Sequence, residues 1–521
     1  MRRLKLITVT MVLVGLWVLA LPGAASAFTG FEPGVADGQE YREVVFLGGT
    51  PEVFKGTVKE TVKKKGDIVQ INLRYKLESE SGTGKLNRTV KLTSQVETRG
   101  DQEVYVTELD NYNETIETAG QKFKTKKDYV FFSGSRVIDH QPAVDFITGN
   151  WYLKKVYEAG RRDKSEVMVE LSGQTEGYNN VWGSGETRTM DMVLRGEPTC
   201  PIWQGTVRMA MNDNLCRDLI YVPSQPELIS FTGGFVDELR GEELLTADYD
   251  LLPGQVPVEN ERGRRTRDQD EDEDEQNAAE EDDSDIYGGR NQGVFNLSAY
   301  SPPEQRRLFV KECKDVRGHW AQRPIEAMCG LGAYDIRGDY FHPGVACRRG
   351  EFIRALVTVG GLDIEPEEQQ KAGRRRGQDQ EQAYFFDVDS RSPYYKYVQT
   401  AGKKGLVETH EKFFRPDDNL TRAEAVTILV KAMGLEHLAP TPQFSTGFKD
   451  DYQIPSWAKD AVYVAQEYGL IRGDFTGGLR IFRPHDIVTR AEAAAMLDRF
   501  REFLNQDLRQ DYRDHLYRYL P

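Results

Sequence analysis

The alternation of apolar and polar residues divides this chain into a strand-rich N-terminal part and a helical C-terminal part. From Val69 to Leu77 every second residue is apolar, which is the period of a half-buried β-strand. A turn at residues 81–84 leads into a second run around Val90 and Leu92. Further candidate strands follow without intervening amphipathic helices, at residues 104–109, 129–132, 151–156, 167–171, 189–194, 206–211 and 228–231. This pattern predicts an all-β domain over residues 28–250, either an antiparallel sandwich or a barrel.

Helical spacing of the apolar residues begins at about residue 304. One apolar stripe runs from Trp457 to Tyr468 and ends at Gly469, and a second helix begins at Thr489. The letters Thr-Arg-Ala-Glu open a helix at residues 421–424 and again at 489–492, and a degraded copy occupies residues 348–351. Each copy follows an aromatic-x-Pro step. We therefore predict a C-terminal part built from repeats at 304–364, 382–440 and 441–503, with a polar insertion at 365–381 and a helical tail at 504–521.

The segment between these two parts is dominated by charge. Residues 262–267 are mostly basic, and twelve acidic residues follow between Asp268 and Asp285. Such a sequence cannot bury enough apolar surface to offset its ordering entropy, so residues 251–303 are predicted to be an acidic disordered linker. Some of its carboxylates fall at the spacing of a calcium-binding loop, but Glu275 stands where that loop requires glycine, and we predict no metal site.

The first residues are typical of an export signal. Arg2, Arg3 and Lys5 precede the apolar run 6–21, and small residues at 25–27 suit cleavage before Phe28. We expect residues 1–27 to be a signal peptide, with an uncleaved membrane anchor as the alternative, and no later stretch is long and apolar enough to span a bilayer. The predicted mature protein is secreted and has no membrane segment.

Charge and cysteine content exclude two further classes of protein, nucleic-acid-binding proteins and disulfide-rich proteins. The formal net charge is -15 and no basic footprint stands out, so no nucleic-acid partner is expected. Five cysteines are too few for a disulfide framework in a chain of 521 residues, although Cys200 and Cys216 are a candidate pair.

The repeated four-residue motif combines a helix cap with a cation. Thr421 with Glu424, and Thr489 with Glu492, have the spacing of a capping box, which accounts for these two residue types. The arginine between them opposes the helix dipole and needs another explanation. Unpaired helix N–H groups beside a guanidinium favour a carboxylate or phosphate ligand. Arg422 and Arg490 are therefore the predicted ligand-binding residues, with Arg349 in the degraded copy.

Residues from about 309 to 500 resemble three tandem S-layer homology domains. The residues that carry the resemblance are Asp315-Val316 with Gly318-His319-Trp320-Ala321, Phe386-Asp387-Val388 with Tyr394 to Val398, Phe448-Lys449-Asp450 with Trp457-Ala458, and the three arginine motifs. The resemblance implies three repeats around a central helical bundle, which bind secondary cell-wall polysaccharide, often pyruvylated, in grooves between repeats. It also implies a location in the cell wall or S-layer of a bacterial surface.

The resemblance assigns ligand contacts residue by residue. Arg349, Arg422 and Arg490 match the family's ligand-facing arginine, and Trp320 and Trp457 match aromatic residues that line the groove. Two repeats depart from the family pattern: Arg348 and Gly350 replace Thr and Ala in the first, and Pro393 replaces the Trp in the second. The third groove is thus the best candidate.

The β-rich part carries no recognisable catalytic motif. His140 is its only histidine, and it contains neither a nucleophile elbow nor a phosphate-binding glycine loop, so we predict no catalytic residue, metal or cofactor. The main hypothesis is a wall-anchored structural or binding domain whose partner is unknown. One alternative is a wall-anchored hydrolase that uses paired carboxylates such as those of Glu108, Asp110, Glu114 and Glu117. Another is binding through the aromatic side chains of Trp151, Trp182 and Trp203.

Overall fold

The computed structural model describes residues 31–36, 40–160, 165–197, 200–223, 233–254, 289–336, 338–362, 384–410, 412–441 and 444–519. The predicted signal peptide, the acidic block 268–285, the polar insertion 365–381 and the candidate strand at 228–231 lie outside these residues. No helix within the described ranges has the length and apolar character that crossing a membrane requires.

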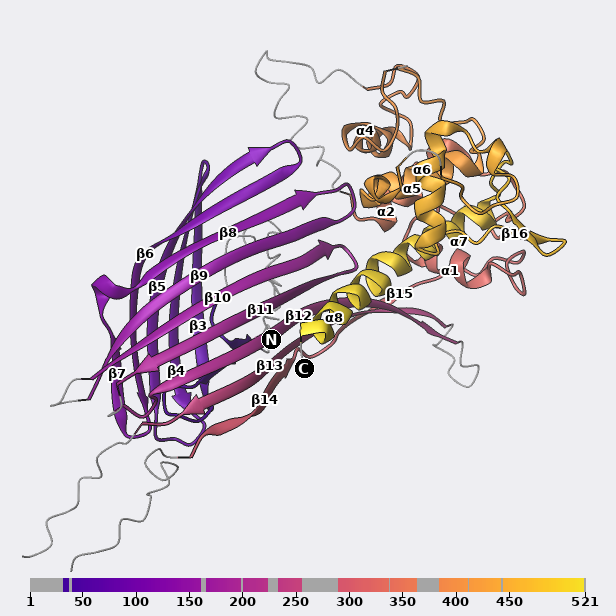
Figure 1. Cartoon of the computed structure of the whole chain (residues 1–521). Helices are drawn as coiled ribbons and strands as arrows, with labels where there is room; N and C mark the ends of the chain where they lie inside the picture. The colour runs from indigo at the N-terminus through magenta and orange to yellow at the C-terminus, as the bar shows by residue number, and fades with distance from the viewer. Residues whose placement is uncertain are drawn as a thin grey trace, which may run out of the picture.

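The N-terminal part is one continuous antiparallel sheet that curls around its own core (Figure 1). Its strands are β1 (Gly34–Ala36), β2 (Tyr41–Val45), β3 (Glu52–Lys65), β4 (Ile68–Ser79), β5 (Lys85–Arg99), β6 (Gln102–Thr118), β7 (Gln121–Thr125), β8 (Phe131–His140), β9 (Asp145–Ala159), β10 (Ser165–Asn180), β11 (Gly183–Gly196), β12 (Gln204–Val222), β13 (Gly234–Leu252), β14 (Asn291–Tyr300) and β15 (Glu304–Leu308). Neighbouring strands are joined mostly in sequence order, with β8 and β7 both placed between β6 and β9.

The strict alternation read from the sequence explains how this sheet buries its core. In β4 the odd-numbered residues from Val69 to Leu77 are buried, and the even-numbered polar residues between them face outward, mostly exposed. The same alternation continues in β5, where the even-numbered residues are buried, and in β10, so inward side chains from many strands form one apolar core. The strands are much longer than the short segments we predicted, reaching 19 residues in β12 and β13, because a single curled sheet can keep extending its pairing.

Two strands lie where a linker or a helical repeat was predicted. β14 pairs with β13 from Asn291 to Tyr300, inside the segment assigned to the acidic linker, and β15 pairs with β13 from Glu304 to Leu308. In β14 the alternating Phe295, Leu297 and Ala299 pack on the core of the sheet, a short signal that the prediction of a linker overlooked. β15 is mostly polar and exposed, and it is held by backbone pairing with β13 and by the buried Leu308.

The C-terminal part is built from helices. They are α1 (Gln322–Gly330), α2 (Arg349–Val359), α4 (Tyr395–Lys403), α5 (Arg422–Met433), α6 (Ser456–Glu467), α7 (Arg490–Glu502) and α8 (Leu508–Tyr519), with a small hairpin of β16 (Asp474–Thr476) and β17 (Leu479–Ile481). A π-helical turn, η5 (Phe503–Asp507), connects α7 to α8. The outer helices α4, α6 and α1 pack on α2, α5 and α7 respectively, so the first outer helix closes against the last inner one.

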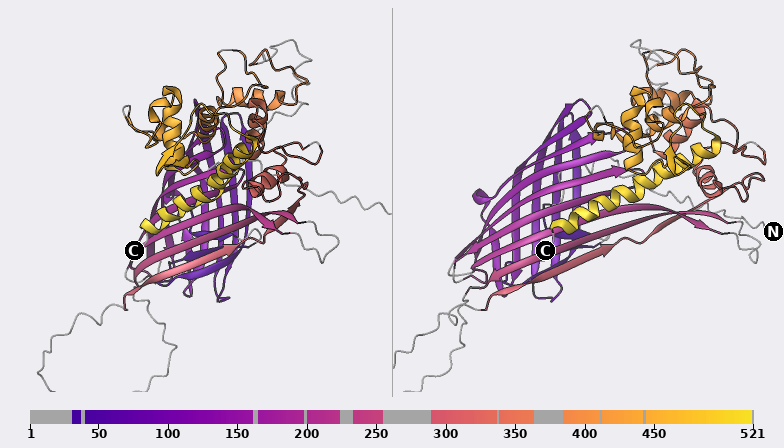
Figure 2. Two further views of the ribbon diagram at one scale, coloured as in Figure 1. Left: turned by 90° about the vertical axis from the view of Figure 1, so that its right-hand side faces the viewer. Right: turned by 45° about the vertical axis from the view of Figure 1, so that its right-hand side comes forward.

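The sheet and the helices share one apolar core instead of being held apart. Trp182, at the turn between β10 and β11, is 1% exposed and belongs to the same buried cluster as the inner helices. Figure 2 shows the helical part seated against one end of the sheet, with α8 crossing the outer face of the strands. The two described parts therefore form a docked unit.

Candidate functional site

The inner helices α2, α5 and α7 begin at three equivalent positions that are joined in a ring. Cys347 N donates to Val488 O at 2.8 Å, Val488 N donates to Leu420 O at 2.9 Å, and Leu420 N donates to Cys347 O at 3.0 Å. Each bond links the residues just before one helix to those before another. The three helix starts therefore meet at one end of the bundle, as the sequence repeat predicted in outline.

The arginines of the motif close a second ring through ion pairs. Arg349 pairs with Glu424, Arg422 Nη1 lies 3.2 Å from Glu492 Oε1, and Arg490 pairs with Glu351. Each arginine thus reaches the glutamate of the next repeat in cyclic order. The residue that seemed unfavourable at a helix N-terminus is stabilised by an acidic group that only the fold brings near.

The helix N–H groups expected to be free are already bonded. Arg422 N donates to Asp486 O at 2.9 Å and Ala423 N donates to Pro484 O at 3.0 Å, and the starts of α2 and α7 are bonded in the same way. The premise of unpaired N–H groups at these helix starts is therefore wrong. The reason is tertiary, because the aromatic-x-Pro loop of a neighbouring repeat supplies the acceptors.

Both predicted capping boxes are present in the structure. Glu424 N donates to Thr421 Oγ1 at 3.4 Å while Thr421 N donates to Glu424 Oε2 at 2.9 Å, and Thr489 and Glu492 make the same pair of bonds. Each of these glutamates uses one oxygen for its own helix and the other for an arginine of another repeat. The cap and the ring are thus built from the same carboxylate.

The degraded copy lacks a cap but has a packing reason for its glycine. Arg348 stands at the N-cap of α2 without a side-chain bond to the helix. A Cβ on Gly350 would lie 2.8 Å from the ring of Tyr394 and 3.1 Å from Pro416 O, so no larger residue fits without movement. Gly350 in the first repeat and Tyr394, which follows Pro393 in the second, therefore fit each other, because the glycine leaves room for the tyrosine ring.

A group of aspartates, to which the sequence reasoning gave no role beyond the family resemblance, positions the aromatic-x-Pro loops. His342, Arg415 and Arg483 have φ values of 60°, 59° and 57°, a left-handed conformation that is costly for residues other than glycine. Their N–H groups donate to Asp315, Asp387 and Asp450, which each also accept from the preceding aromatic residue. Burial tends to raise the pKa of Asp315, but these backbone donors outweigh it and lower that pKa.

The guanidinium groups retain donors that the protein does not use. Arg349 and Arg422 each donate Nε to a carbonyl, of Phe414 at 3.0 Å and Phe482 at 2.9 Å, whereas the buried Nε of Arg490 has no partner among the described residues. The guanidinium of Arg490 lies 4.5 Å from the ring centre of Phe341. Of the predicted aromatic contacts, Trp320 is 67% exposed and Trp457 is 56% exposed.

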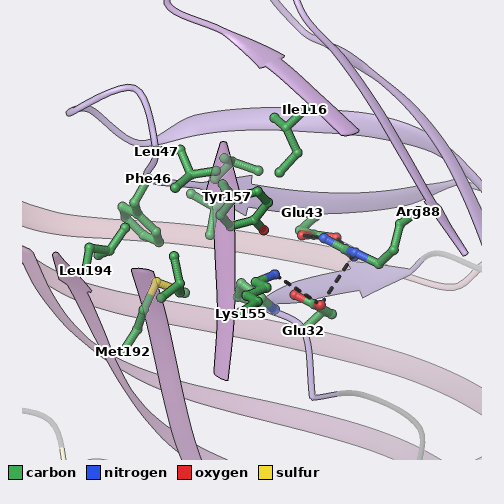
Figure 3. A pocket seen from close by; sticks show the side chains of 14 residues that line it. Glu32, Glu43, Phe46, Leu47, Arg88, Ile116, Lys155, Tyr157, Met192 and Leu194 are labelled. Atoms are coloured by element: carbon green, nitrogen blue, oxygen red, sulfur yellow. Dashed lines mark hydrogen bonds and ion pairs between the residues drawn. The ribbon is translucent and has the colours of Figure 1, made fainter. Parts of the chain in front are cut away.

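A second cluster of charged residues lies inside the sheet (Figure 3). Glu32, Glu43 and Glu114 surround Arg88 and Lys155, and all five side chains are at most 6% exposed. Arg88 holds Glu43 through two bonds of 2.6 and 2.7 Å and donates Nε to Glu114 at 2.6 Å. The sequence reasoning missed this cluster, because its members are spread over 123 residues and no local motif connects them.

Electrostatics within this cluster favour a fixed ionic network. Burial raises the pKa of Glu43 against the opposing effect of Arg88, while for Glu114 the cations Arg88 and Lys155 outweigh burial and lower the pKa. The adjacent cavity, lined on its other side by apolar residues such as Phe46 and Met192, has room for only a few water molecules. The arrangement stabilises the interior and leaves no space for a polymer substrate.

Among the candidate carboxylates of the hydrolase alternative, Glu114 is separated from the others. It points into the core, whereas Glu108 and Asp110 are exposed on β6 and Glu117 pairs with Lys122 on the outer face. Of the candidate aromatic residues, Trp151 and Trp182 are buried and belong to the core. Cys200 and Cys216 are both free thiols, so the candidate disulfide is wrong, and Cys216 instead contacts α8 and η5.

Comparison with known proteins identifies the helical part. The S-layer homology domain family matches residues 385–426 and 447–494. The chain contains S-layer homology repeats. These two matched segments cover the second and third positions of the ring, and α1 and α2 occupy the remaining position through the contacts described above.

Relatives of the S-layer homology protein include surface-layer and carbohydrate-related proteins. The chain is 30% identical over 184 residues to the surface-layer 125 kDa protein of Lysinibacillus sphaericus, covering 34% of this chain and 14% of the relative. It is 34% identical to a cellulosome-anchoring protein of Acetivibrio thermocellus, covering 18% of this chain and 20% of the relative. It is 29% identical to exoglucanase XynX of Acetivibrio thermocellus, covering 47% and 20%. The chain thus spans a fifth or less of these relatives, and the S-layer homology repeats indicate a secreted, wall-anchored surface protein.

Proposed function

We propose that this S-layer homology protein attaches to the cell wall through grooves between three repeats, of which residues 304–364 form the first, and that it holds its sheet rigidly on the wall. The observation that carries the proposal is the double ring at the start of α2, α5 and α7, which places Arg349, Arg422 and Arg490 at one end of the bundle. The sheet docks against the opposite end of the same helices, so it leaves the arginine end uncovered.

The proposed ligand is a secondary cell-wall polysaccharide that carries carboxylates, such as pyruvate ketals. A planar guanidinium with an unused donor suits bidentate contact with a carboxylate, and exposed indoles such as Trp320 and Trp457 suit the face of a sugar ring. Arg490 is the best candidate, because its side chain is 18% exposed and only its Nη1 is paired among the described residues, with Glu351. The proposal gives the ring arginines two roles, stability through glutamate and recognition through the remaining donor.

The experiment is a pull-down of the mature full chain with isolated cell-wall sacculi. The double variant Arg422→Lys, Arg490→Lys keeps the charge needed for the glutamate pairs but loses the planar fork, and we expect a loss of binding of about tenfold or more. Arg208→Lys, on the sheet, is the matched control. Sacculi stripped of the secondary polymer, or treated with mild acid to remove pyruvate, should retain little protein. Undiminished binding by the double variant or to stripped sacculi would refute the proposal.

A wall-anchored hydrolase is the second candidate, because several relatives are named as glycan-degrading enzymes, among them an exoglucanase and an amylopullulanase. The test is incubation of the full chain with wall glycan and with soluble glucans, followed by measurement of released reducing sugar. Release that survives Glu114→Gln would place catalysis elsewhere than the buried cluster. Release of product in any of these assays would favour this candidate over a purely structural role for the sheet.

A further inference from the structure

The outer face of β3, β4 and β5 is strongly basic in a protein of net charge -15. The outward positions of these strands carry eight exposed cations: Lys55, Lys59, Lys63, Lys65, Arg74, Lys76, Lys85 and Lys91. Glu78 is the one acidic side chain among the outward positions from Lys55 to Lys91. We call this surface the basic face. It forms the wall of the sheet opposite the one that α8 crosses (Figures 1 and 2).

Strand register places six of these cations opposite one another or opposite neutral residues, while Lys55 and Lys85 both lie across from Glu78 and Lys85 also lies across from Glu117. Lys59 lies directly across from Arg74, Lys76 from Thr57 and Asn87, and Lys91 from Asn72. Lys85 has an acidic neighbour, Glu78, at 3.8 Å, and no ion pair involves the other seven within the described part of the chain. A like-charge pair directly across two strands is unfavourable, so this arrangement opposes folding.

Cations elsewhere on the same outer surface are neutralised by acidic partners. Lys122 pairs with Glu117 at 2.9 Å, Lys126 with Glu166 at 2.6 Å, and Lys154 with Glu170 at 2.9 Å. Arg208 lies 3.5 Å from Asp191 on the neighbouring strand. These four cations are paired, three of them across neighbouring strands, whereas seven of the eight cations on the basic face have no ion pair among the residues that the structure describes.

Protection of a strand edge explains only part of this difference. Beyond Gly56, β3 pairs with β4 alone, so its lysines can discourage edge-to-edge association. Arg74, Lys76 and Lys91 lie on β4 and β5, which are paired on both sides and need no such protection. These interior cations require another explanation.

We propose that the basic face binds a linear polyanion of the cell wall, a phosphodiester-linked polymer whose charges repeat along its length. Outward residues on one strand recur about every 6.6 Å and neighbouring strands lie about 4.8 Å apart, which gives a flat grid of cations suited to an extended chain. Net negative charge elsewhere on the protein would repel such a polymer, so binding is confined to this wall of the sheet. The proposal depends on the proposed surface location but not on the arginine ring.

The test uses the mature full chain and immobilised poly(glycerol phosphate), with neutral dextran as the reference matrix. The variant Lys59→Gln, Arg74→Gln, Lys76→Gln, Lys91→Gln removes four cations from the basic face. The variant Lys122→Gln, Lys126→Gln, Lys154→Gln, Arg208→Gln removes four paired cations from the rest of the sheet and is the matched control. We expect the first variant to bind at least about tenfold more weakly with a shallower salt dependence, and the second to stay within about twofold of the unchanged protein.

Each outcome of this comparison decides for or against the basic face. Equal losses in both variants would show that only net charge matters, and an unchanged first variant would show that the face is not used. Binding to vesicles containing phosphatidylglycerol but not to the polymer would replace the proposed partner with a membrane surface.

The first variant is expected to resist urea at least as well as the unchanged protein, since repulsion between its cations is removed. Polymer binding should survive Arg422→Lys, Arg490→Lys, which separates this test from that of the wall-anchoring grooves.

Discussion

The arginine of the repeated motif shows how one residue can be misread when its partners are distant. At the first helical position it opposes the dipole, and that conflict correctly marked Arg422 as unusual. The fold resolves the conflict with Glu492, which lies 70 residues further along the chain. The chemistry of Arg422 thus indicated that this residue has a specific role, while the neighbouring repeat supplies its partner, Glu492.

The buried network inside the sheet gives a prediction at the same scale. Glu114→Gln removes the carboxylate that pairs with both Arg88 and Lys155, and leaves Lys155 with Glu32 as its one remaining ion-pair partner among the described residues. We expect the free energy of unfolding to fall by about 3 to 5 kcal/mol. Urea unfolding followed by tryptophan fluorescence measures this. Glu117→Gln, three positions along the same strand on the exposed face, should change stability by less than about 1 kcal/mol. Similar losses in both variants would contradict the structural role of the network.

At the scale of elements, the sheet caps the C-terminal ends of all three inner helices. Trp182 Nε1 donates to Val359 O at the end of α2 at 2.8 Å, and Ala143 N donates to Ala432 O near the end of α5 at 2.8 Å. Asn180 Nδ2 donates to Leu504 O just after α7 at 2.9 Å. The sheet therefore supplies donors to carbonyls at or near the ends of α2 and α5 and in the π-helical turn after α7.

The tryptophan at this junction can be tested by a pair of substitutions. Trp182→Phe keeps an aromatic ring between Arg217 and Arg501 but leaves the Val359 carbonyl without a donor, and we expect a loss of about 1 to 3 kcal/mol. Trp182→Ala also opens a cavity and should cost about 3 to 5 kcal/mol. Chemical unfolding of the full chain measures both. The exposed Trp457 is the control, and its replacement by Phe should leave stability nearly unchanged.

Acid should weaken the contact between the sheet and the last helices. Asp218 accepts from Asn505 at 3.0 Å and pairs with Arg240, and although burial tends to raise the pKa of Asp218, these donors lower it overall. A lowered pKa means that the carboxylate stabilises the fold at pH values above its ordinary pKa of about 3.9, and that this contribution is lost as the pH falls through the lower value of the folded state.

The measurement is urea stability at pH 7 and at pH 3, for the unchanged chain and for Asp218→Asn. The variant is expected to be less stable at pH 7 and to lose less stability on acidification. Equal acid sensitivity of the two chains would show that other carboxylates account for the effect.

At the scale of the whole molecule, the buried cluster of the helices extends into the end of the sheet. The ring of Tyr178 packs in a tilted arrangement against that of Tyr512 of α8, 5.2 Å between ring centres, and Val144 and Trp182 belong to the helical core. A chain of this size usually unfolds domain by domain. The shared core instead predicts that the sheet and the helices lose their structure together.

Differential scanning calorimetry of the mature chain tests this cooperativity. We expect one transition, with a ratio of calorimetric to van't Hoff enthalpy of about 1. Weakening the junction by Trp182→Ala should split the transition into two, whereas Trp457→Ala should not. Two separate transitions in the unchanged chain would mean that the docked ends contribute little stability.

The sequence by itself determined the strand and helix character of the two parts, the presence of S-layer homology repeats and the capping residues, because each of these depends on local periodicity or on bonds three residues apart. It could not determine strand length, the strand β15 or the buried network of Arg88, because those depend on partners brought together by the sheet. The use of the helix N–H groups and of the ring arginines was likewise decided by tertiary structure, since their acceptors lie on other repeats. The docking of the sheet on the helix ends was also decided by tertiary structure, because the sequence around a helix end does not show which distant donor will reach its carbonyl groups.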